Sequence, residues 1–302
     1  MGKTSRFIVN VIIFLVVIGF IAYIVSSVNT DETTSTTNNI QEAFVSSIEK
    51  VKTLEFPFEI THFELVRDTI FLTSSQTVFI YHPNGEKIRQ FQIQAGCNDI
   101  AVDKGRLFVL YPTFVAVYTT AGDSLDRWEA CSEQSDYCAL TLTSDFAFVT
   151  DVQNKNICQY TRDGNFVRFI FSPHGFLIPS YSFDISNHND TVYAVNSGRH
   201  LIESYTREGS FIASFGGSGT ESGFFAGCCN PAFISIGENG EFFTSEKGNP
   251  RVSTFSKNGE FGQVLLNNQL LGGGYEAYRI DVDSNHLFVC NKKLINIYAL
   301  KK

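Results

Sequence analysis

Residues 77–86 read TVFIYHPNGE, an apolar strand that ends on Tyr81 and leads into a turn containing Gly85. The same pattern returns along the chain as FVAVYTTAGD, NICQYTRDGN, LIESYTREGS, RVSTFSKNGE and LINIYALKK. The aromatic residues that anchor these segments are Tyr81, Tyr118, Tyr160, Tyr205, Phe255 and Tyr298. They follow one another at intervals of roughly 40 to 50 residues, a period typical of units built from four strands. The chain therefore contains one structural unit in six copies.

The flanks of these segments predict the remaining strands of each unit. In the first five copies a glycine follows four residues after the aromatic, at Gly85, Gly122, Gly164, Gly209 and Gly259. Glycine tolerates the positive φ that tight hairpins require, so each of these turns should link a third strand to a fourth. Second strands are expected to begin at Ile70, Leu107, Ala147, Val192, Phe242 and Leu287.

The two ends of the repeat are complementary. The sixth copy stops at Lys302 after its third strand, whereas residues 51–59 (VKTLEFPFE) precede the first copy without a partner. Pairing of 51–59 with the C-terminal blade would close a ring and remove its exposed edges. The sequence thus predicts an all-β, six-bladed β-propeller over residues 51–302. A solenoid of stacked β units is the alternative, but it leaves the orphan first strand unexplained.

Composition agrees with this fold class and excludes one class of partner. Aromatic residues make up 14% of the chain and charged residues only 18%, a balance that favours strands over helices. The formal net charge of −8 offers no basic footprint for nucleic acid. We expect no nucleic-acid binding.

The N-terminal part predicts attachment to a lipid bilayer. Residues 7–28 (FIVNVIIFLVVIGFIAYIVSSV) carry no charge and, at about 1.5 Å per residue, are long enough as a helix to cross a membrane. The competing interpretation is a cleaved signal peptide, whose apolar region is shorter. Lys3 and Arg6 precede the span, which favours a cytoplasmic N-terminus and a periplasmic or extracellular propeller.

These features divide the chain into four parts. We expect a cytoplasmic tail at 1–6, a transmembrane signal-anchor helix at 7–28, a polar tether at 29–50 and the propeller at 51–302. The tether is rich in Thr and Asn, and such a segment buries too little apolar surface to fold alone. Its end, residues 40–51, is also compatible with a short amphipathic helix.

Several copies resemble the NHL-repeat β-propellers. The fifth copy is the nearest, with FGGSGTESG at 215–223 followed by CCNPAFISIGENGEFFTSEKGNPRVSTFSKNGEF, and the fourth, VYAVNSGRHLIESYTREGSFIASFG, is similar. The stretch from Phe225 to Pro231 and the later TSEKGNPRV also resemble membrane-anchored or exported bacterial NHL proteins of unassigned role. The resemblance implies a fold and an interaction surface, and no reaction.

Seven cysteines suggest a thiol-rich channel mouth. First strands are expected near Ile100, Leu140, Phe183, Phe233 and Ile280, and cysteines precede three of them. Because innermost strands line the channel of a propeller, residues that precede them should crowd one mouth. The predicted binding set at this mouth is Cys97, Asn98, Asp99, Cys138, Cys228, Cys229 and Asn230.

Other interpretations of these cysteines stay open. Free cysteines often act as small buried apolar residues, and Cys131 and Cys138 are close enough in sequence for a local disulfide. The alternatives that would give these cysteines a function are disulfides at the channel mouth, or metal or redox chemistry there. No CxxC pair supports a zinc site.

One further turn is a candidate contact. Residues 246–251 (EKGNPR) form a tight polar turn between two strands, with Glu246, Lys247 and Arg251 as candidate ligand or partner contacts. The structural interpretation is a hairpin in which Arg251 bonds to neighbouring carbonyl groups.

The sequence leaves three function classes open. The absence of a catalytic motif favours a membrane-tethered, non-catalytic propeller that binds a protein, peptide or glycan through its loop face, with no cofactor. One alternative is an exported metal-dependent hydrolase or lyase resembling lactonase-type propellers, with calcium or zinc in the channel. Its candidate ligands are His62, Asn98, Asp99, Asp184 and Asn230. The other alternative is a thiol or redox role for the cysteines at the channel mouth.

Overall fold

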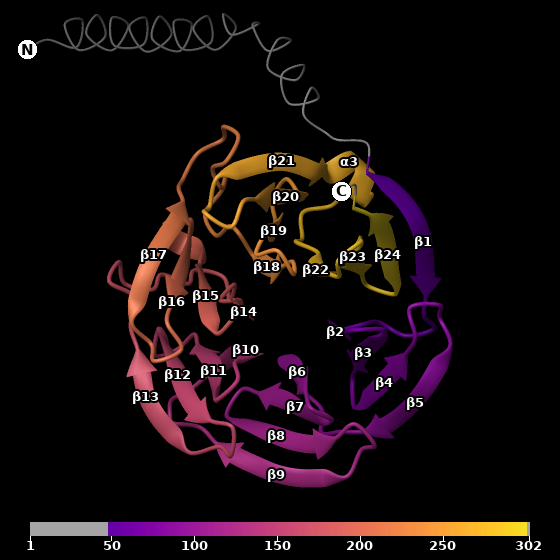
Figure 1. Cartoon of the computed structure of the whole chain (residues 1–302), viewed down its shortest axis with the longest axis vertical. Helices are drawn as coiled ribbons and strands as arrows, with labels where there is room; N and C mark the ends of the chain where they lie inside the picture. Colours follow the sequence, from indigo (N-terminus) through magenta and orange to yellow (C-terminus); the bar gives the residue numbers. More distant parts are fainter. Residues whose placement is uncertain (1–47, 301–302) are drawn as a thin grey trace, which may run out of the picture. The chain divides into compact units, whose positions relative to one another are not determined.

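The computed structural model describes residues 48–300, which form six four-stranded antiparallel sheets arranged around a central channel (Figure 1). The innermost strands are β2 (His62–Val66), β6 (Asp99–Asp103), β10 (Tyr137–Leu142), β14 (Ile185–His188), β18 (Phe233–Ile236) and β22 (Arg279–Val282). The second strands are β3 (Thr69–Ser74), β7 (Arg106–Tyr111), β11 (Phe146–Asp151), β15 (Thr191–Asn196), β19 (Phe242–Glu246) and β23 (His286–Asn291). The six-bladed propeller predicted from the repeat is confirmed.

The third strands contain the repeated aromatic residues. They are β4 (Thr77–Tyr81), β8 (Phe114–Thr119), β12 (Asn156–Thr161), β16 (Leu201–Tyr205), β20 (Arg251–Phe255) and β24 (Leu294–Ala299). The outermost strands are β5 (Lys87–Gln92), β9 (Ser124–Glu129), β13 (Phe166–Ile170), β17 (Phe211–Gly216), β21 (Phe261–Leu266) and β1 (Glu49–Glu55). Two short helices, η2 (Ser197–Arg199) and α3 (Asn268–Leu271), lie in connections.

The ring closes through the first strand, as the sequence predicted. Strand β1 pairs antiparallel with β24, from Glu49 opposite Ala299 to Glu55 opposite Leu294, and completes the sixth sheet. It begins and ends earlier than the predicted 51–59, because the chain leaves the sheet at Phe56 and Pro57. Leu54 is buried in a cluster that joins blade 6 to blade 1.

The N-terminal predictions lie mostly outside the described residues. The span 7–28 and most of the tether 29–50 belong to that part of the chain. Where the structure does describe the tether, Glu49 and Lys50 are strand residues of β1, so the helical interpretation of 40–51 is wrong at its end. No helix within 48–300 has the length and apolar character needed to cross a membrane.

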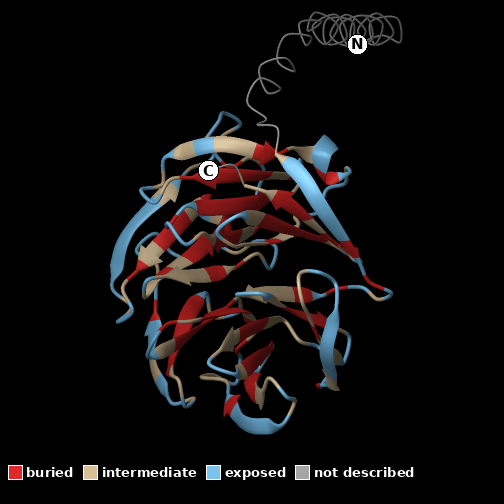
Figure 2. Cartoon of the chain, turned by 45° about the vertical axis from the view of Figure 1, so that its right-hand side comes forward, coloured by how far each residue is buried: buried red, intermediate tan, exposed pale blue. Residues whose placement is uncertain are grey.

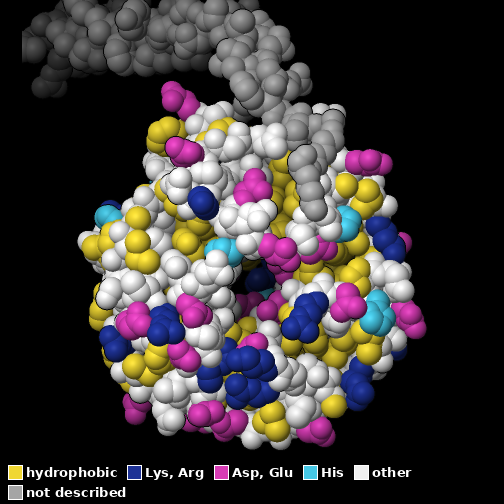
Figure 3. Space-filling view, in the orientation of Figure 1, with side chains coloured by type: hydrophobic (Ala, Val, Ile, Leu, Met, Phe, Trp, Pro, Cys, Tyr) yellow, Lys and Arg dark blue, Asp and Glu magenta, His cyan; other side chains and the backbone are white. Residues whose placement is uncertain are grey.

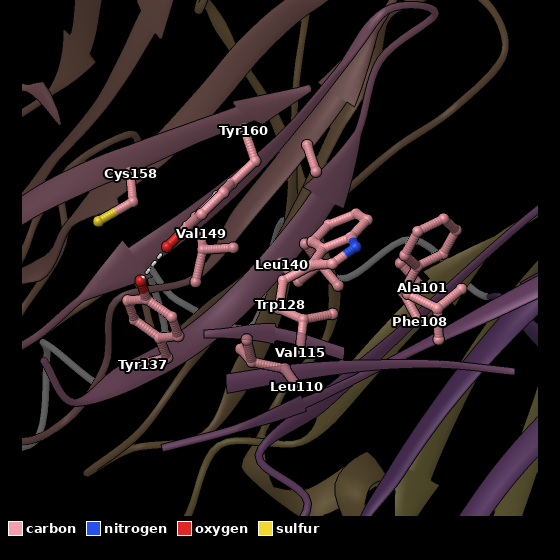
Figure 4. Packing of buried hydrophobic residues seen from close by; sticks show 12 residues of the cluster. Ala101, Phe108, Leu110, Val115, Trp128, Tyr137, Leu140, Val149, Cys158 and Tyr160 are labelled. Carbon is pink, nitrogen blue, oxygen red and sulfur yellow. Dashed lines mark hydrogen bonds between the residues drawn. The ribbon is translucent and has the colours of Figure 1, made fainter. Parts of the chain in front are cut away.

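The core lies between the blades, with buried residues on the inner strands and exposed ones on the outer strands (Figure 2). One of the interblade clusters joins Trp128 of β9 to Tyr160 of β12, and Figure 4 shows its side chains, including the facing Tyr137 and Tyr160 hydroxyls. Aromatic rings contribute to each of these clusters alongside aliphatic side chains.

The turn glycines have a second role that the sequence did not indicate. Gly164 has a φ of +80°, and a Cβ atom placed on it would overlap the indole ring of Trp128 in the preceding blade. Gly122 meets Phe91, and Gly259 meets Phe215, in the same way. The repeated glycine therefore permits both the hairpin and the close packing of one blade on the next.

Gly164→Ala tests this second role, with Gly105→Ala as the matched control. Both glycines have a positive φ, but nothing lies within 4 Å of a Cβ atom on Gly105. We expect each substitution to cost about 1–2 kcal/mol of unfolding free energy for the left-handed backbone, and Gly164→Ala a further ~1–3 kcal/mol for overpacking. Urea denaturation measures both. Equal losses would contradict the packing role.

Leu54→Ala tests the closure. The side chain of Leu54 is buried between blades 6 and 1, whereas Val51 on the same strand is 48% exposed. Removal of the buried methyl groups should lower the free energy of unfolding by about 2–5 kcal/mol, while Val51→Ala should change it by less than about 0.5 kcal/mol. Thermal and urea unfolding of the two variants gives the comparison. An unchanged unfolding free energy in Leu54→Ala would show that this contact between blades 6 and 1 does not stabilise the ring.

Candidate functional site

One face of the ring carries connections of unequal length, and we call it the loop face. It holds the segments that lead from the outermost strand of one blade to the innermost strand of the next. Those at 171–184, 217–232 and 267–278 are longer than those at 56–61, 93–98 and 130–136. The long connections follow blades 3, 4 and 5, so additional chain gathers over one side of this face.

The three long connections meet at the turn between β19 and β20. The Lys247 ammonium donates to the hydroxyls of Ser180 and Ser182, the latter at 3.3 Å. Asn230 exchanges hydrogen bonds of 2.9 Å with the backbone N–H and C=O of Lys247. Gly248 N–H donates to the Tyr275 carbonyl at 2.7 Å. Lys247 and Gly248 thus anchor a residue from each long connection.

We call Lys247 and Gly248, with the residues that they bind, the hub of the loop face. Exposed aromatic side chains lie around it. Tyr181 is 46% exposed, Phe224 40% and Tyr275 79%, and we call these three residues the aromatic rim. Tyr181 has a φ of 61°, an unfavourable conformation for a bulky residue, and its hydroxyl donates to the Asp136 carboxylate. Backbone strain of this kind persists only where the surroundings impose it, and it concentrates at functional sites.

The central channel is a second candidate region. A cavity of about 310 Å³ is lined by residues of the innermost strands, and Figure 3 shows the ring hollowed at its centre, with charged side chains inside the hollow. The charged residues that line it are Glu64, Asp99, Asp184, Arg279 and Asp281. The cavity therefore holds four carboxyl groups and one guanidinium.

Three of the four carboxyl groups bond to the next blade. Asp281 accepts from Leu65 N–H at 2.7 Å, Asp99 from Leu140 N–H at 2.9 Å, and Asp184 from Ile234 N–H at 2.8 Å. Glu64 is different, because its Oε2 is buried without a hydrogen-bond partner among the described residues. At two further interfaces the bond joins side chains: Asn187 donates to Thr141, and Ser235 to Asp281. We call this series the channel ring.

Burial alters the acidity of these groups. It raises the pKa of Asp99 to about 6 and that of Asp184 to about 7, and also raises those of Glu64 and Asp281. The Arg279 guanidinium opposes the shift at Asp99, whose Oδ1 lies 3.9 Å away. Carboxyl groups with such pKa values can take up or release a proton near neutral pH.

The residues predicted for the channel mouth separate into two groups. Cys97 donates to the Asp99 carbonyl at 3.3 Å, and Cys138 to the Tyr181 carbonyl at 3.2 Å. Burial raises the pKa of both thiols to about 12. Cys228 and Cys229 form a separate pair with their sulfur atoms 3.1 Å apart. Across residues 48–300 no hydrogen bond or disulfide joins the pair to Cys97 or Cys138.

The predicted disulfide between Cys131 and Cys138 is wrong. Cys131 is bonded to Cys158, and Cys138 is free. Cys131 follows β9 and Cys158 lies in β12, so the bond joins blade 2 to blade 3. Figure 4 shows Cys158 near Tyr137 and Tyr160. Cys138 is held away by its position in β10, where its thiol faces Tyr181.

The polar residues of the 246–251 turn mainly support the loops. Glu246 is buried and accepts from Arg251 at 2.6 Å, and Arg251 also donates to the Phe224 carbonyl at 2.7 Å. The bonds of Glu246 and Arg251 match the structural interpretation of the turn. Among the three candidate contacts of this turn, Lys247 is the one that bonds to more than one long connection.

Asn98, from the set predicted for the channel mouth, donates to the Tyr137 carbonyl.

The structure does not bring the proposed calcium or zinc ligands together. Asn230 is occupied within its loop, and His62, Asp99 and Asp184 form no group of converging ligand atoms among residues 48–300. Among residues 48–300 one group of three His, Cys, Asp or Glu brings its ligand atoms together, namely Cys131, Asp151 and Cys158. Both of its sulfur atoms are already in the Cys131–Cys158 disulfide.

Sequence reasoning missed three channel residues. Glu64, Arg279 and Asp281 were not singled out, although each places a charge in a short strand that is otherwise mainly apolar, HFELV or RIDV. A charge at an innermost-strand position was the available signal.

Asp184→Asn should remove a pH dependence from stability. Protonation of Asp184 stabilises the folded state fully below its unfolded pKa, ~4, and this contribution is lost as pH rises through about 7. Asparagine keeps an acceptor for Ile234 but does not titrate. The unfolding free energy of the parent should therefore fall relative to the variant between pH 4 and 7.5, by on the order of 1.4 kcal/mol per unit of pKa shift. Urea denaturation at each pH measures these free energies. If the unfolding free energies of parent and variant change equally with pH, Asp184 does not have the raised pKa assigned to it.

Solved structures with similar folds include two named lyases. Virginiamycin B lyase from Staphylococcus aureus matches with a TM-score of 0.57 and 12% identity, over 83% of this chain and 99% of that chain. A streptogramin B lyase matches with a TM-score of 0.59 and 14% identity, over 83% and 88%. A protein of unknown function from Bacteroides thetaiotaomicron gives 0.57 and 14%, over 86% and 74%.

These likenesses establish the six-bladed fold and nothing finer. No protein-family model and no curated protein matches the chain. The resemblance to NHL repeats therefore stays a prediction.

Proposed function

We propose that this chain is a membrane-tethered, non-catalytic propeller that binds a protein, peptide or glycan partner through its loop face. The convergence of three long connections on Lys247, with the aromatic rim around it, is the observation that carries the proposal. Tyrosine and phenylalanine supply large contact areas at low entropy cost and are common anchors of binding surfaces.

The arrangement is preorganised for contact. The Tyr181 hydroxyl donates to the Asp136 carboxylate. The backbone carbonyls of Phe224 and Tyr275 accept hydrogen bonds from Arg251 and from Gly248 N–H, respectively. A surface whose loops are already ordered loses less conformational entropy when a partner binds. In the proposed topology the tether carries this face on the periplasmic or extracellular side of the bilayer.

Site-specific photo-crosslinking tests the proposal in cells. A benzophenone amino acid at Tyr275 should give a discrete adduct, whereas one at Leu125, which is 51% exposed on outermost strand β9, should not. Tyr181→Ala should reduce the Tyr275 adduct roughly tenfold, because loss of an interface aromatic often costs more than about 1.4 kcal/mol. Protease and glycosidase digestion of the adduct identifies the partner class.

Two results would contradict the proposal. Equal adducts from Tyr275 and Leu125 would indicate non-specific capture, and an adduct insensitive to Tyr181→Ala would remove the aromatic rim from the contact. Melting temperature of the Tyr181→Ala variant controls for misfolding.

The second candidate is acid–base catalysis in the channel by a hydrolase or lyase. The raised pKa values of Asp99 and Asp184 support it, and solved structures with the same fold include virginiamycin B lyase, one of them with quinupristin. Consumption of quinupristin by the full-length chain, lost in Asp184→Asn, would favour this candidate over the binding module. The metal-dependent form has no supporting ligand set in residues 48–300.

A further inference from the structure

The adjacent cysteines of the loop face form a distinct chemical group. Their sulfur atoms lie 3.1 Å apart; Cys228 is exposed and Cys229 is buried. Asn230 ties the loop that carries them to Ala226 and Lys247 with bonds of 2.7 and 2.9 Å. The two thiols are therefore held together by an ordered loop, with one of them open to solvent.

The surroundings of the pair favour one thiolate. Burial raises the pKa of Cys229, but hydrogen bonds from Ser180, Cys228 and Lys247, with the charge of Lys247, outweigh it and leave that pKa below the usual value. The bond between the thiols raises the pKa of Cys228. Removal of one proton from the pair thus leaves negative charge on Cys229, where Lys247 stabilises it.

The other free cysteines lack this arrangement. Burial raises the pKa of Cys97, Cys138 and Cys290 to about 12. A thiolate is the reactive form of cysteine, so these three stay inert while the pair can react. Reactivity should be confined to one loop.

We propose that Cys228 and Cys229 form a redox-active vicinal dithiol that small disulfides oxidise to a Cys228–Cys229 disulfide. The Cys229 thiolate takes the proton of the exposed Cys228 thiol as the Cys228 sulfur attacks a disulfide RSSR, whose S–S bond breaks and releases one RS⁻. Cys229 passes that proton to the released RS⁻ and, again as the thiolate, attacks the Cys228 sulfur of the mixed disulfide, and the second RS⁻ leaves. The two protons of the dithiol end on the two RS⁻ groups, so RSSR is reduced to two RSH while the protein loses two electrons.

Oxidation would change the hub of the loop face. In the disulfide Cys229 carries no negative charge, so Lys247 loses that partner and keeps Ser180 and Ser182. This inference does not depend on the proposed binding function, because it concerns the chemistry of the pair itself.

Oxidised glutathione is the probe for a direct test on the full-length chain in detergent. After reaction, free thiols are alkylated and the protein is unfolded and digested with trypsin. The peptide 208–247 contains Cys228 and Cys229 and no other cysteine. We expect it to be recovered unalkylated and two hydrogen atoms lighter than the dithiol, and reduction before alkylation should restore two alkylation sites.

Single variants separate the two steps. Cys229→Ser should stop at a stable glutathione adduct on Cys228, because no thiol remains to resolve it. Lys247→Met removes the tryptic site at 247, so in this variant the two cysteines lie in peptide 208–251, still without another cysteine. Their alkylation at pH 7 should slow roughly tenfold for each pKa unit gained by Cys229. Lys247→Arg keeps the cleavage site and should retain most of the rate. Melting temperatures show whether each variant folds.

Three outcomes would overturn the proposal. Recovery of peptide 208–247 as a fully alkylated dithiol would show that the pair does not react. A lasting glutathione adduct in the parent chain would show that Cys229 does not resolve it. Equal alkylation rates in the parent and Lys247→Met would show that Lys247 does not stabilise the Cys229 thiolate. A failure of crosslinking at Tyr275 would contradict the proposed binding function but not this inference.

Discussion

The pairing of β1 with β24 is the constraint on which the rest of the structure depends. It supplies the outermost strand of blade 6 and places Leu54 in the cluster between blades 6 and 1. The channel ring needs this closure, because the hydrogen bond that Leu65 N–H donates to Asp281 joins the first blade to the last. Without a closed ring the channel carboxyl groups would lose both their spacing and their low-dielectric surroundings.

The channel shows how one set of side chains can serve structure before function. Three of the four channel carboxyl groups, those of Asp99, Asp184 and Asp281, accept a backbone hydrogen bond from the neighbouring blade, which fixes the distance between innermost strands. A buried carboxyl group without such a partner would cost free energy. The raised pKa values of Asp184 and Asp99 are thus a consequence of their structural placement. The loop face differs from the channel, because its residues are exposed and its connections vary in length.

The sequence predicted what repeats and missed what depends on a single neighbour. The aromatic residue of each copy and the glycine of the first five, such as Tyr160 and Gly164, define the blade because these five copies share the same local hairpin. The Cys131–Cys158 bond could not be predicted from spacing, since Cys158 approaches Cys131 only when blade 3 packs on blade 2. Arg279 lies near Asp99 only because the ring brings β22 and β6 to one channel.

The closing strand also sets the order of events during synthesis. Strand β1 is made first, and its partner β24 is made after all other strands, so about 10 to 50 s separate them at ~5–20 residues per second. During that interval β1 is an unpaired edge, and it carries Glu49, Lys50, Lys52 and Glu55. Charged residues oppose pairing with another chain, so the composition of β1 keeps the first strand soluble until the last one arrives.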